Sequence, residues 1–262
     1  MSKEKYYFSK SLEKGLKILA LFNGQTPAFT QSEIAKMLGL NMTTTYRYIN
    51  TLVELGYLEK VKKTREIRPS ILCTLFCMNL MRATDHLRLI KEVVDQIHAE
   101  HNISIDVVFA DDDTMVRVYH RSAEETLTYS LPDSSKNCFH NTALGKAYLC
   151  SLPDDQIAEK IDKMELVSKT KNTIINKAKL ATDLKQSKVR GFAMNIEEFL
   201  PGLIAIAAPL YDPISNKGVG AVCFDFSVFQ HSADEIKTKY GGMIQTTAQS
   251  LSELLPPDKA RK

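Results

Sequence analysis

Residues 29–58 read FTQSEIAKMLGLNMTTTYRYINTLVELGYL. Thr30, followed three positions later by Glu33, fits the capping box that begins many helices. The apolar residues that follow share one side of a helix over 31–38. Gly39 is suited to end this helix, because glycine adopts the left-handed conformation found after many helices. The pattern therefore predicts a short helix that ends in a tight turn.

A second helix is predicted to begin after Asn41 and to run to Leu55, with Gly56 ending it. Its inward positions are Thr45, Ile49, Leu52 and Val53. Two helices joined by a short turn form the arrangement that places the start of the second helix in the major groove of DNA. The sequence therefore predicts a helix-turn-helix.

Two further features flank this pair. An amphipathic helix is expected over 11–22, with one side formed by Leu12, Leu16, Ile18 and Leu19. Two short strands are expected over 57–61 and 65–68 around the turn 62–64, and Pro69 closes the unit. The hairpin carries Lys60, Lys62, Lys63, Arg65 and Arg68. Such a basic wing is expected to lie along the DNA backbone and to add salt-dependent affinity.

The start of the second helix carries side chains that can reach base edges and phosphates, and Arg47 can pair with guanine or a phosphate. The candidate DNA-binding residues are Thr30, Met42, Thr43, Thr44, Tyr46, Arg47, Lys62, Lys63 and Arg65. A three-helix domain with a solvated charged loop is the simpler alternative. The combination of helix, glycine turn, helix and basic hairpin favours DNA over that alternative.

The charge is distributed unevenly along the chain, whose net charge is +3. Residues 1–85 contain 13 Lys and Arg against 7 Asp and Glu, and the remaining residues contain 21 against 24. A basic first third beside a mildly acidic remainder indicates that one module meets a polyanion and the other does not.

A long helical pattern begins at Ile71 and continues to His98, with a break near Thr84 and Asp85. Its first part is apolar on nearly every side, and such a helix must be buried by something. Packing between domains or between subunits would do this. We therefore expect a linker helix over 71–90, between a DNA-binding domain over 1–70 and a second domain over 91–258.

The second domain is predicted to be α+β, because strands and helices alternate in mixed order. Strands are expected over 103–109, 115–119, 126–131, 203–210 and 218–227, and helices over 142–151, 154–163, 176–190 and 233–254.

The remaining sequence features point to a cytoplasmic protein. The segment 1–10 has no apolar core of a signal peptide, and the longest apolar stretch, 203–210, is too short to span a bilayer. The five cysteines are odd in number and predict free thiols. Cys73 and Cys77 are interpreted as buried core residues, since two thiols alone do not make a zinc site. We expect no metal and no cofactor.

Three stretches resemble the IclR-type transcriptional regulators. The first is 29–58, quoted above. The second, His140-Asn-Thr-Ala-Leu-Gly-Lys-Ala, resembles the family motif His-Ala-Thr-Ala-x-Gly-Lys-Ala. The third comprises Gly191-Phe-Ala-Met-Asn-Ile-Glu-Glu and Gly202-Leu-Ile-Ala-Ile-Ala-Ala-Pro, which resemble a later family signature. The resemblance covers nearly the whole chain in the right order.

This resemblance implies a GAF-like C-terminal domain that binds a small organic effector, often an acid, and a protein that forms dimers or tetramers. Effector binding is then expected to alter affinity for a palindromic DNA operator. The implied effector-binding residues are Phe139, Ala143, Leu144, Asn195, Leu203, Ala205, Cys223 and Asp225. The backbone N–H groups of Ala143 and Leu144 begin a helix and are suited to hold an anion.

Several implied pocket residues depart from the family pattern. Asn195 stands where the family usually has Asp, and Ala205 stands where it frequently has Cys. Cys223 and Asp225 stand where the family often has serines. A buried Asp225 opposes another negative charge unless one of the two is protonated. The hypothesis is an effector that is larger, less anionic or aromatic. The alternative is that Asp225 faces away and caps a neighbouring loop.

Two other function classes compete with a regulator. An enzyme with a helical appendage is disfavoured, because no nucleophile is paired with a base and no catalytic residue is assigned. His140 is interpreted as structural, and the adjacent Glu197 and Glu198 are expected to point apart. A protein-interaction module, in which the basic wing meets an acidic partner, would bind DNA with a salt slope near zero.

Overall fold

The computed structural model describes residues 8–22, 26–61, 63–83, 85–111, 113–124, 134–136 and 138–256. The chain divides into two compact units, 1–84 and 85–262. The helix pattern from Ile71 breaks at this division, as expected. The finer division into 1–70, 71–90 and 91–258 stays a prediction.

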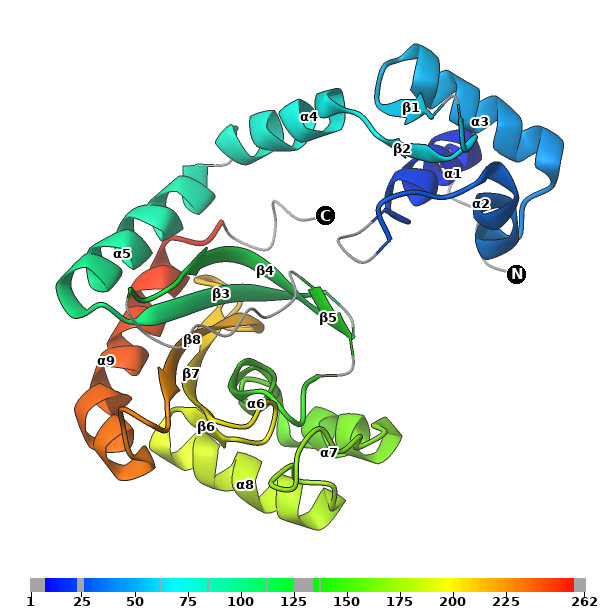
Figure 1. The fold of residues 1–262 in the computed structure, drawn as a ribbon. Coiled ribbons are helices and arrows are strands. Elements are labelled where there is room, and N and C mark those ends of the chain that lie inside the picture. The colour runs from blue at the N-terminus through cyan, green and yellow to red at the C-terminus, as the bar shows by residue number, and fades with distance from the viewer. Residues whose placement is uncertain are drawn as a thin grey trace. The chain divides into compact units, whose positions relative to one another are not determined.

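The first unit is a helix-turn-helix followed by a two-stranded wing and a further helix (Figure 1). Its elements are α1 (Lys10–Leu19), α2 (Gln31–Leu38), α3 (Met42–Glu54), β1 (Leu58–Lys60), β2 (Ile67–Pro69) and α4 (Ile71–Arg82). The strands β1 and β2 pair antiparallel, with Glu59 opposite Arg68. The small core consists of Ile18, Phe29, Ile34, Ile49, Leu52, Leu58 and Ile67.

The helix boundaries follow from the predicted caps. Thr30 and Glu33 form a complete capping box at the start of α2, and Gly39 ends it with φ 62°. The Asn41 side chain accepts a hydrogen bond from Thr44 N at 2.8 Å and begins α3. Each cap satisfies backbone groups that a helix end would otherwise leave unpaired.

The helix α1 ends at Leu19 rather than at Phe22, and of its predicted apolar side only Ile18 is buried, whereas Leu12 and Leu16 are 63% and 56% exposed. One prediction about burial in this unit is wrong. Cys77 is exposed and Cys73 is half-buried rather than in the core. The reason is that α4 leaves most of its apolar side chains exposed in this single chain.

The second unit contains a six-stranded antiparallel sheet in the order β5-β4-β3-β8-β7-β6. Its strands are β3 (Ser104–Asp111), β4 (Thr114–Arg121), β5 (Ser134–Lys136), β6 (Ala193–Ile196), β7 (Leu203–Tyr211) and β8 (Gly218–Ser227). The strands β5 and β6 were not expected. The predicted strand over 126–131 lies outside the described residues.

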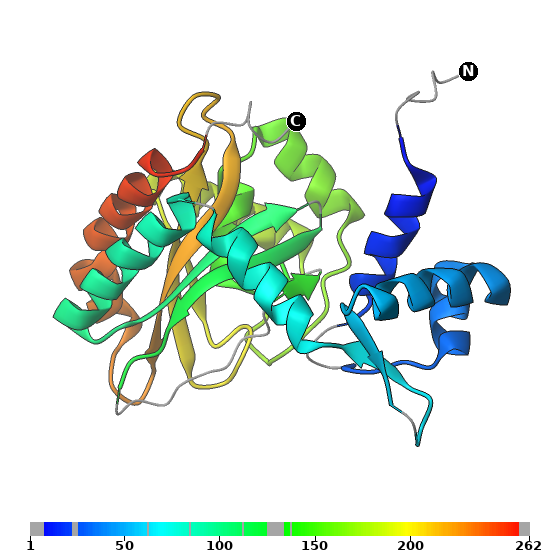
Figure 2. The same ribbon diagram turned by 90° about the horizontal axis from the view of Figure 1, so that it is seen from above.

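Helices cover both faces of this sheet. They are α5 (Asp85–His101), α6 (Ala143–Cys150), α7 (Asp154–Lys163), α8 (Lys177–Arg190) and α9 (Ala233–Glu253). Figures 1 and 2 show α5 and α9 side by side against one face, with α6, α7 and α8 on the other. Each face has its own apolar cluster, and Phe224 belongs to the α9 side while Cys223 belongs to the α6 side. Among the described residues, no helix is long and apolar enough to cross a membrane.

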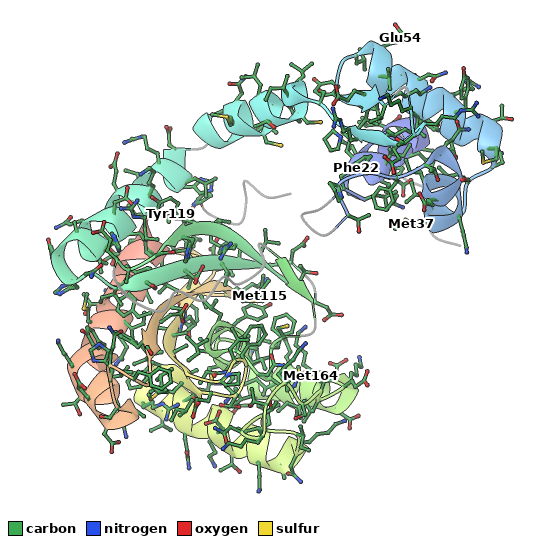
Figure 3. All side chains as sticks on the ribbon, viewed as in Figure 1. Phe22, Met37, Glu54, Met115, Tyr119 and Met164 are labelled. Atoms are coloured by element: carbon green, nitrogen blue, oxygen red, sulfur yellow. The ribbon has the colours of Figure 1, made fainter. Side chains whose placement is uncertain are left out.

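A bulge between β3 and β4 changes which side chains of β4 face each layer. The register places Tyr119 opposite Val107 but Arg117 opposite Val108. As a result Met115 joins the cluster on the α6 side, whereas Tyr119 donates a hydrogen bond to Asp95 of α5 at 2.6 Å (Figure 3). The bulge therefore brings Arg117 to the α6 face.

Gly145 allows α6 to approach the preceding chain closely. A Cβ atom at this position would lie 2.4 Å from Phe139 Cα and 2.7 Å from Cys138 O. Both neighbours are backbone atoms, so no side-chain rotation can relieve the contact.

Gly145→Ala is therefore expected to destabilise the second unit by about 1–3 kcal/mol through overpacking. Gly242→Ala in α9 is the matched control, because its Cβ would meet nothing within 4 Å. Alanine there is expected to stabilise the helix by about 0.5–1 kcal/mol. Urea unfolding followed by circular dichroism measures both, and a Gly145→Ala protein as stable as Gly242→Ala would contradict this account.

Candidate functional site

The candidate DNA-binding residues of α3 form an exposed face over its first two turns. Met42 and Tyr46 are about half exposed, at 49% and 50%, and Thr43 and Arg47 are exposed. Thr44 is half-buried. Among the described residues, the Arg47 side chain forms no hydrogen bond or ion pair. This face therefore presents a free guanidinium and short polar groups to solvent.

Thr30 is placed differently from the other candidates. Its hydroxyl donates to Glu33 Oε2 at 2.8 Å and accepts from Glu33 N, so it is used in the cap of α2. Gln31, which was not predicted, donates from Nε2 to Met42 O at 3.2 Å. This bond joins the start of α2 to the start of α3.

The wing has two kinds of basic residue. Lys60 donates to Asn50 Oδ1 and lies over the Tyr46 ring, and Arg68 pairs with Glu59 across the strands. Lys63 and Arg65 are exposed, and within the described part of the chain their side chains have no partner. Lys62 lies outside the described residues. The charges without a partner thus lie in the turn of the hairpin, and the paired ones lie in its strands.

The second unit has a small pocket between the start of α6 and the sheet. It is lined by Thr142, Ala143, Leu144, Asn195, Phe199, Leu203, Ala205, Cys223 and Asp225. Seven of the eight implied effector residues therefore lie together. Phe139 does not line this pocket; it is buried against Tyr148, with Lys160 over its ring. Thr142 and Phe199 were not predicted. Thr142 could have been found, because a threonine directly before a predicted helix is a typical capping residue.

The pocket is nearly closed as it stands. The space open to the centre of a water molecule is about 10 Å³, roughly what one water needs. One end is the start of α6, where the Thr142 hydroxyl accepts from Gly145 N at 3.0 Å. The N–H groups of Ala143 and Leu144 precede the first intrahelical bonds, so this end favours negative charge.

The other end of the pocket is acidic. Cys223 Sγ donates to Asp225 Oδ1 at 3.1 Å. Burial raises the pKa of Asp225 well above its usual value, and the neighbouring Asp106 raises it further. Asp106 is fully buried, and its Oδ1 lies 3.0 Å from His120 Nδ1 and 3.4 Å from Arg117 Nη1. Burial and the neighbouring acid therefore both disfavour the ionised form of Asp225.

A buried ion pair fixes α6 beneath the pocket. Lys146 is completely buried, and its Nζ lies 2.5 Å from Glu198 Oε1 and 2.9 Å from Asp183 Oδ2. Burial raises the pKa of Glu198, whereas Lys146 lowers it. Asn195 connects the same segments a second time, because its side chain donates to Asn141 O and accepts from Glu198 N. These contacts position the β6–β7 connection that carries Phe199.

The residues considered for catalysis have structural partners. His140 is buried, and its Nε2 lies 3.0 Å from Val167 O. Burial lowers its pKa. Glu197 accepts from Gly202 N at 2.8 Å, whereas Glu198 pairs with Lys146, so the adjacent carboxylates point to different partners. Among the described residues, no group of three or more His, Cys, Asp or Glu is arranged to hold a metal ion.

Comparison with known proteins agrees with this arrangement in both units. A family model described as the IclR helix-turn-helix domain matches residues 11–62. A second, described as bacterial transcriptional regulator IclR C-terminal, matches residues 78–253. The transcriptional repressor IclR of Escherichia coli (strain K12) is 21% identical over 245 residues, which cover 93% of this chain and 89% of that protein.

Solved structures share the fold at low identity. The IclR transcriptional regulator from Alicyclobacillus acidocaldarius has a TM-score of 0.80 at 17% identity, over 95% of this chain and 99% of that one. An IclR homologue from Microbacterium hydrocarbonoxydans, solved with 4-hydroxybenzoate, has a TM-score of 0.72 at 16% identity, over 92% and 100%. The matches span both units in order, and the chain therefore belongs to the IclR family of transcriptional regulators.

Proposed function

We propose that this protein binds a specific DNA operator through α3 and the wing, and that a small organic effector bound in the α6 pocket changes its affinity for that operator. The observation that carries the proposal is the exposed α3 face, where Arg47 is free beside a hairpin with free charges at its tip. Such a face reads base edges in the major groove while the wing contacts phosphates.

The effector is proposed to be an organic acid or an aromatic compound. The family relative solved with 4-hydroxybenzoate supports this size class. The pocket has room for about one water as it stands, so it must widen to admit such a molecule. The pocket supports binding rather than turnover, because His140 contacts a backbone carbonyl and not a nucleophile. By linkage, operator DNA must change effector affinity by the same factor by which the effector changes operator affinity.

The protein is further proposed to act as a homodimer or tetramer in the cytoplasm. The helix α4 leaves Ile71 84% exposed, with Leu75, Phe76 and Leu80 also exposed. A contiguous apolar helix face of this kind is commonly covered by a partner. A second copy would also match a palindromic operator, since a two-fold dimer reads two half-sites.

The first test is selection of bound fragments from genomic DNA of the source organism, followed by titration of the selected site. A specific site with a dissociation constant of about 10⁻⁸ M or tighter is expected. Arg47→Ala is expected to weaken binding to this site by about tenfold to a hundredfold, because a base contact is worth about 1–3 kcal/mol.

Lys237→Ala is the control for this substitution, since it removes the same charge from an exposed position of the other unit. Its affinity for the selected site is expected to equal that of the unaltered protein. The selection is made once with cell extract as a source of effector and once without it. The proposal fails if neither selection enriches a site, or if Arg47→Ala and Lys237→Ala bind alike.

The wing is expected to contribute affinity without specificity. Lys63→Ala should weaken binding to the selected site and to unrelated DNA by a similar factor. It should also reduce the slope of log K against log salt concentration by about one, because one phosphate contact is lost. Titrations at several salt concentrations measure the slope, and an unchanged slope would place Lys63 outside the interface.

A further inference from the structure

A hollow of about 500 Å³ lies at the sheet edge of the second unit, where the edge strand β6 stops short of its neighbour β7 (Figure 1). The two strands pair as far as Ala193 and Ala207, whereas β7 continues to Tyr211. Among the described residues, the end of β7 therefore has no strand beside it on this edge. The hollow shares no lining residue with the effector pocket, and its volume is within the range of small-molecule sites.

Both helical layers contribute walls to this hollow. Ala147 of α6 lines it from one layer, and Gln245 and Ala248 of α9 line it from the other. Gly191, which ends α8 with φ 83°, lies against α9, because a Cβ atom there would be 2.4 Å from Gln245 Oε1. The lining also includes Ala193 of β6, and the alanines of the wall are buried. These short side chains leave space between the two layers.

The open end of β7 is poorly suited to pairing with a further strand. Pro209 has no N–H, and Tyr211 N already donates to Ser252 Oγ at 3.0 Å. Proline is one of the devices by which sheet edges avoid such pairing. A small molecule therefore fits this place better than a strand of a second chain.

The charged groups of the lining are already paired or lie in solvent. Lys188, the single cation of the described lining, contacts Asp154 Oδ1 at 2.6 Å. Asp212 Oδ1 accepts from Ser215 N at 2.7 Å within its own turn, and Glu253 is exposed. The hollow therefore offers an acid no unpaired cation, and burial of an unpaired carboxylate is costly.

Tyr211 provides an uncharged polar group in this wall. Its side chain is half-buried, and among the described residues its hydroxyl has no hydrogen-bond partner. Burial raises the pKa of Tyr211, so the hydroxyl keeps its proton at neutral pH and can both donate and accept. The Cys150 thiol of the same lining is also uncharged, because burial raises its pKa to about 12. A tyrosine hydroxyl with an apolar surrounding usually has a partner.

We propose that this hollow is a second binding site, and that it takes a small uncharged molecule with an apolar body and an amide or hydroxyl group that hydrogen-bonds to Tyr211 Oη. The apolar body lies against the alanines of the wall. The site is separate from the effector pocket, although α6 lines both: Ala143 and Leu144 line the effector pocket, and Ala147 and Cys150 line this hollow. The inference does not depend on the proposed function.

The test is fluorine NMR of the full-length protein without DNA, at neutral pH, titrated with 4-fluorobenzamide and separately with 4-fluorobenzoate. The two probes share the ring and the fluorine and differ in charge. Gln249→Trp introduces a large side chain into the lining from an exposed position of α9. Gln156→Trp is the control, because it makes the same change at an exposed position of α7 that does not line the hollow.

The unaltered protein and Gln156→Trp are expected to bind 4-fluorobenzamide with equal affinity, and Gln249→Trp at least about tenfold more weakly. Tyr211→Phe should bind the amide about threefold to tenfold more weakly, because one hydrogen bond is lost. Any binding of 4-fluorobenzoate should be unchanged in all three variants, since the acid does not enter this hollow. Tyr211→Phe should unfold at the same urea concentration as the unaltered protein.

The proposal is overturned if Gln249→Trp and Gln156→Trp bind the amide alike, if Gln249→Trp loses the acid as strongly as the amide, or if the amide does not bind up to its solubility limit. Should Gln249→Trp not fold, Tyr211→Phe decides the question, and an unchanged affinity for the amide overturns the proposal. Because no DNA is present, failure to select an operator would count against the regulator function and leave this site standing, and the reverse also holds.

Discussion

The buried ammonium group of Lys146 is the constraint on which the second unit depends. An unpaired charge at this depth would cost several kcal/mol, so its partners must be held in place. Glu198 and Asp183 reach it from the β6–β7 connection and from α8. One side chain of α6 therefore connects the sheet edge, a loop and a second helix. The start of α6, the β6–β7 connection and the strands that line the pocket are positioned by this connection.

The candidate sites of the two units differ in charge: the first is basic, and the second contains a carboxyl group. In the first unit the α3 face and the wing tip carry Arg47, Lys63 and Arg65, whose side chains have no partner among the described residues. We propose that these charges meet a polyanion. In the second unit the pocket lies between a helix N-terminus and the carboxyl group of Asp225. The membership of the chain in the IclR family connects these parts as a DNA-binding regulator with an effector domain.

Local sequence signals predicted the local structure well. Seven of the eight residues that the family resemblance implied line one pocket, and its role as an effector site stays a proposal. The capping box at Thr30 and the turn at Gly39 involve neighbours in sequence, so they could be recognised directly. The cluster of Asp106, Arg117 and His120 could not, because it depends on strand register and on a bulge between distant residues. The one sign of this cluster in the sequence is Asp106, a carboxylate within the apolar run 103–109. The apolar side predicted for α1 is mostly exposed, because periodicity alone does not say how much of an apolar side is covered by its neighbours.

The central claim is that α3 reads bases from the major groove of a specific operator. Methylation interference tests it most directly, because methyl groups at guanine N7 project into that groove. Full-length protein is bound to a selected operator that has been methylated sparsely, and bound and free DNA are compared. The account predicts that methylation at a few defined guanines excludes the protein. Binding that is indifferent to methylation at every guanine of the operator would contradict it.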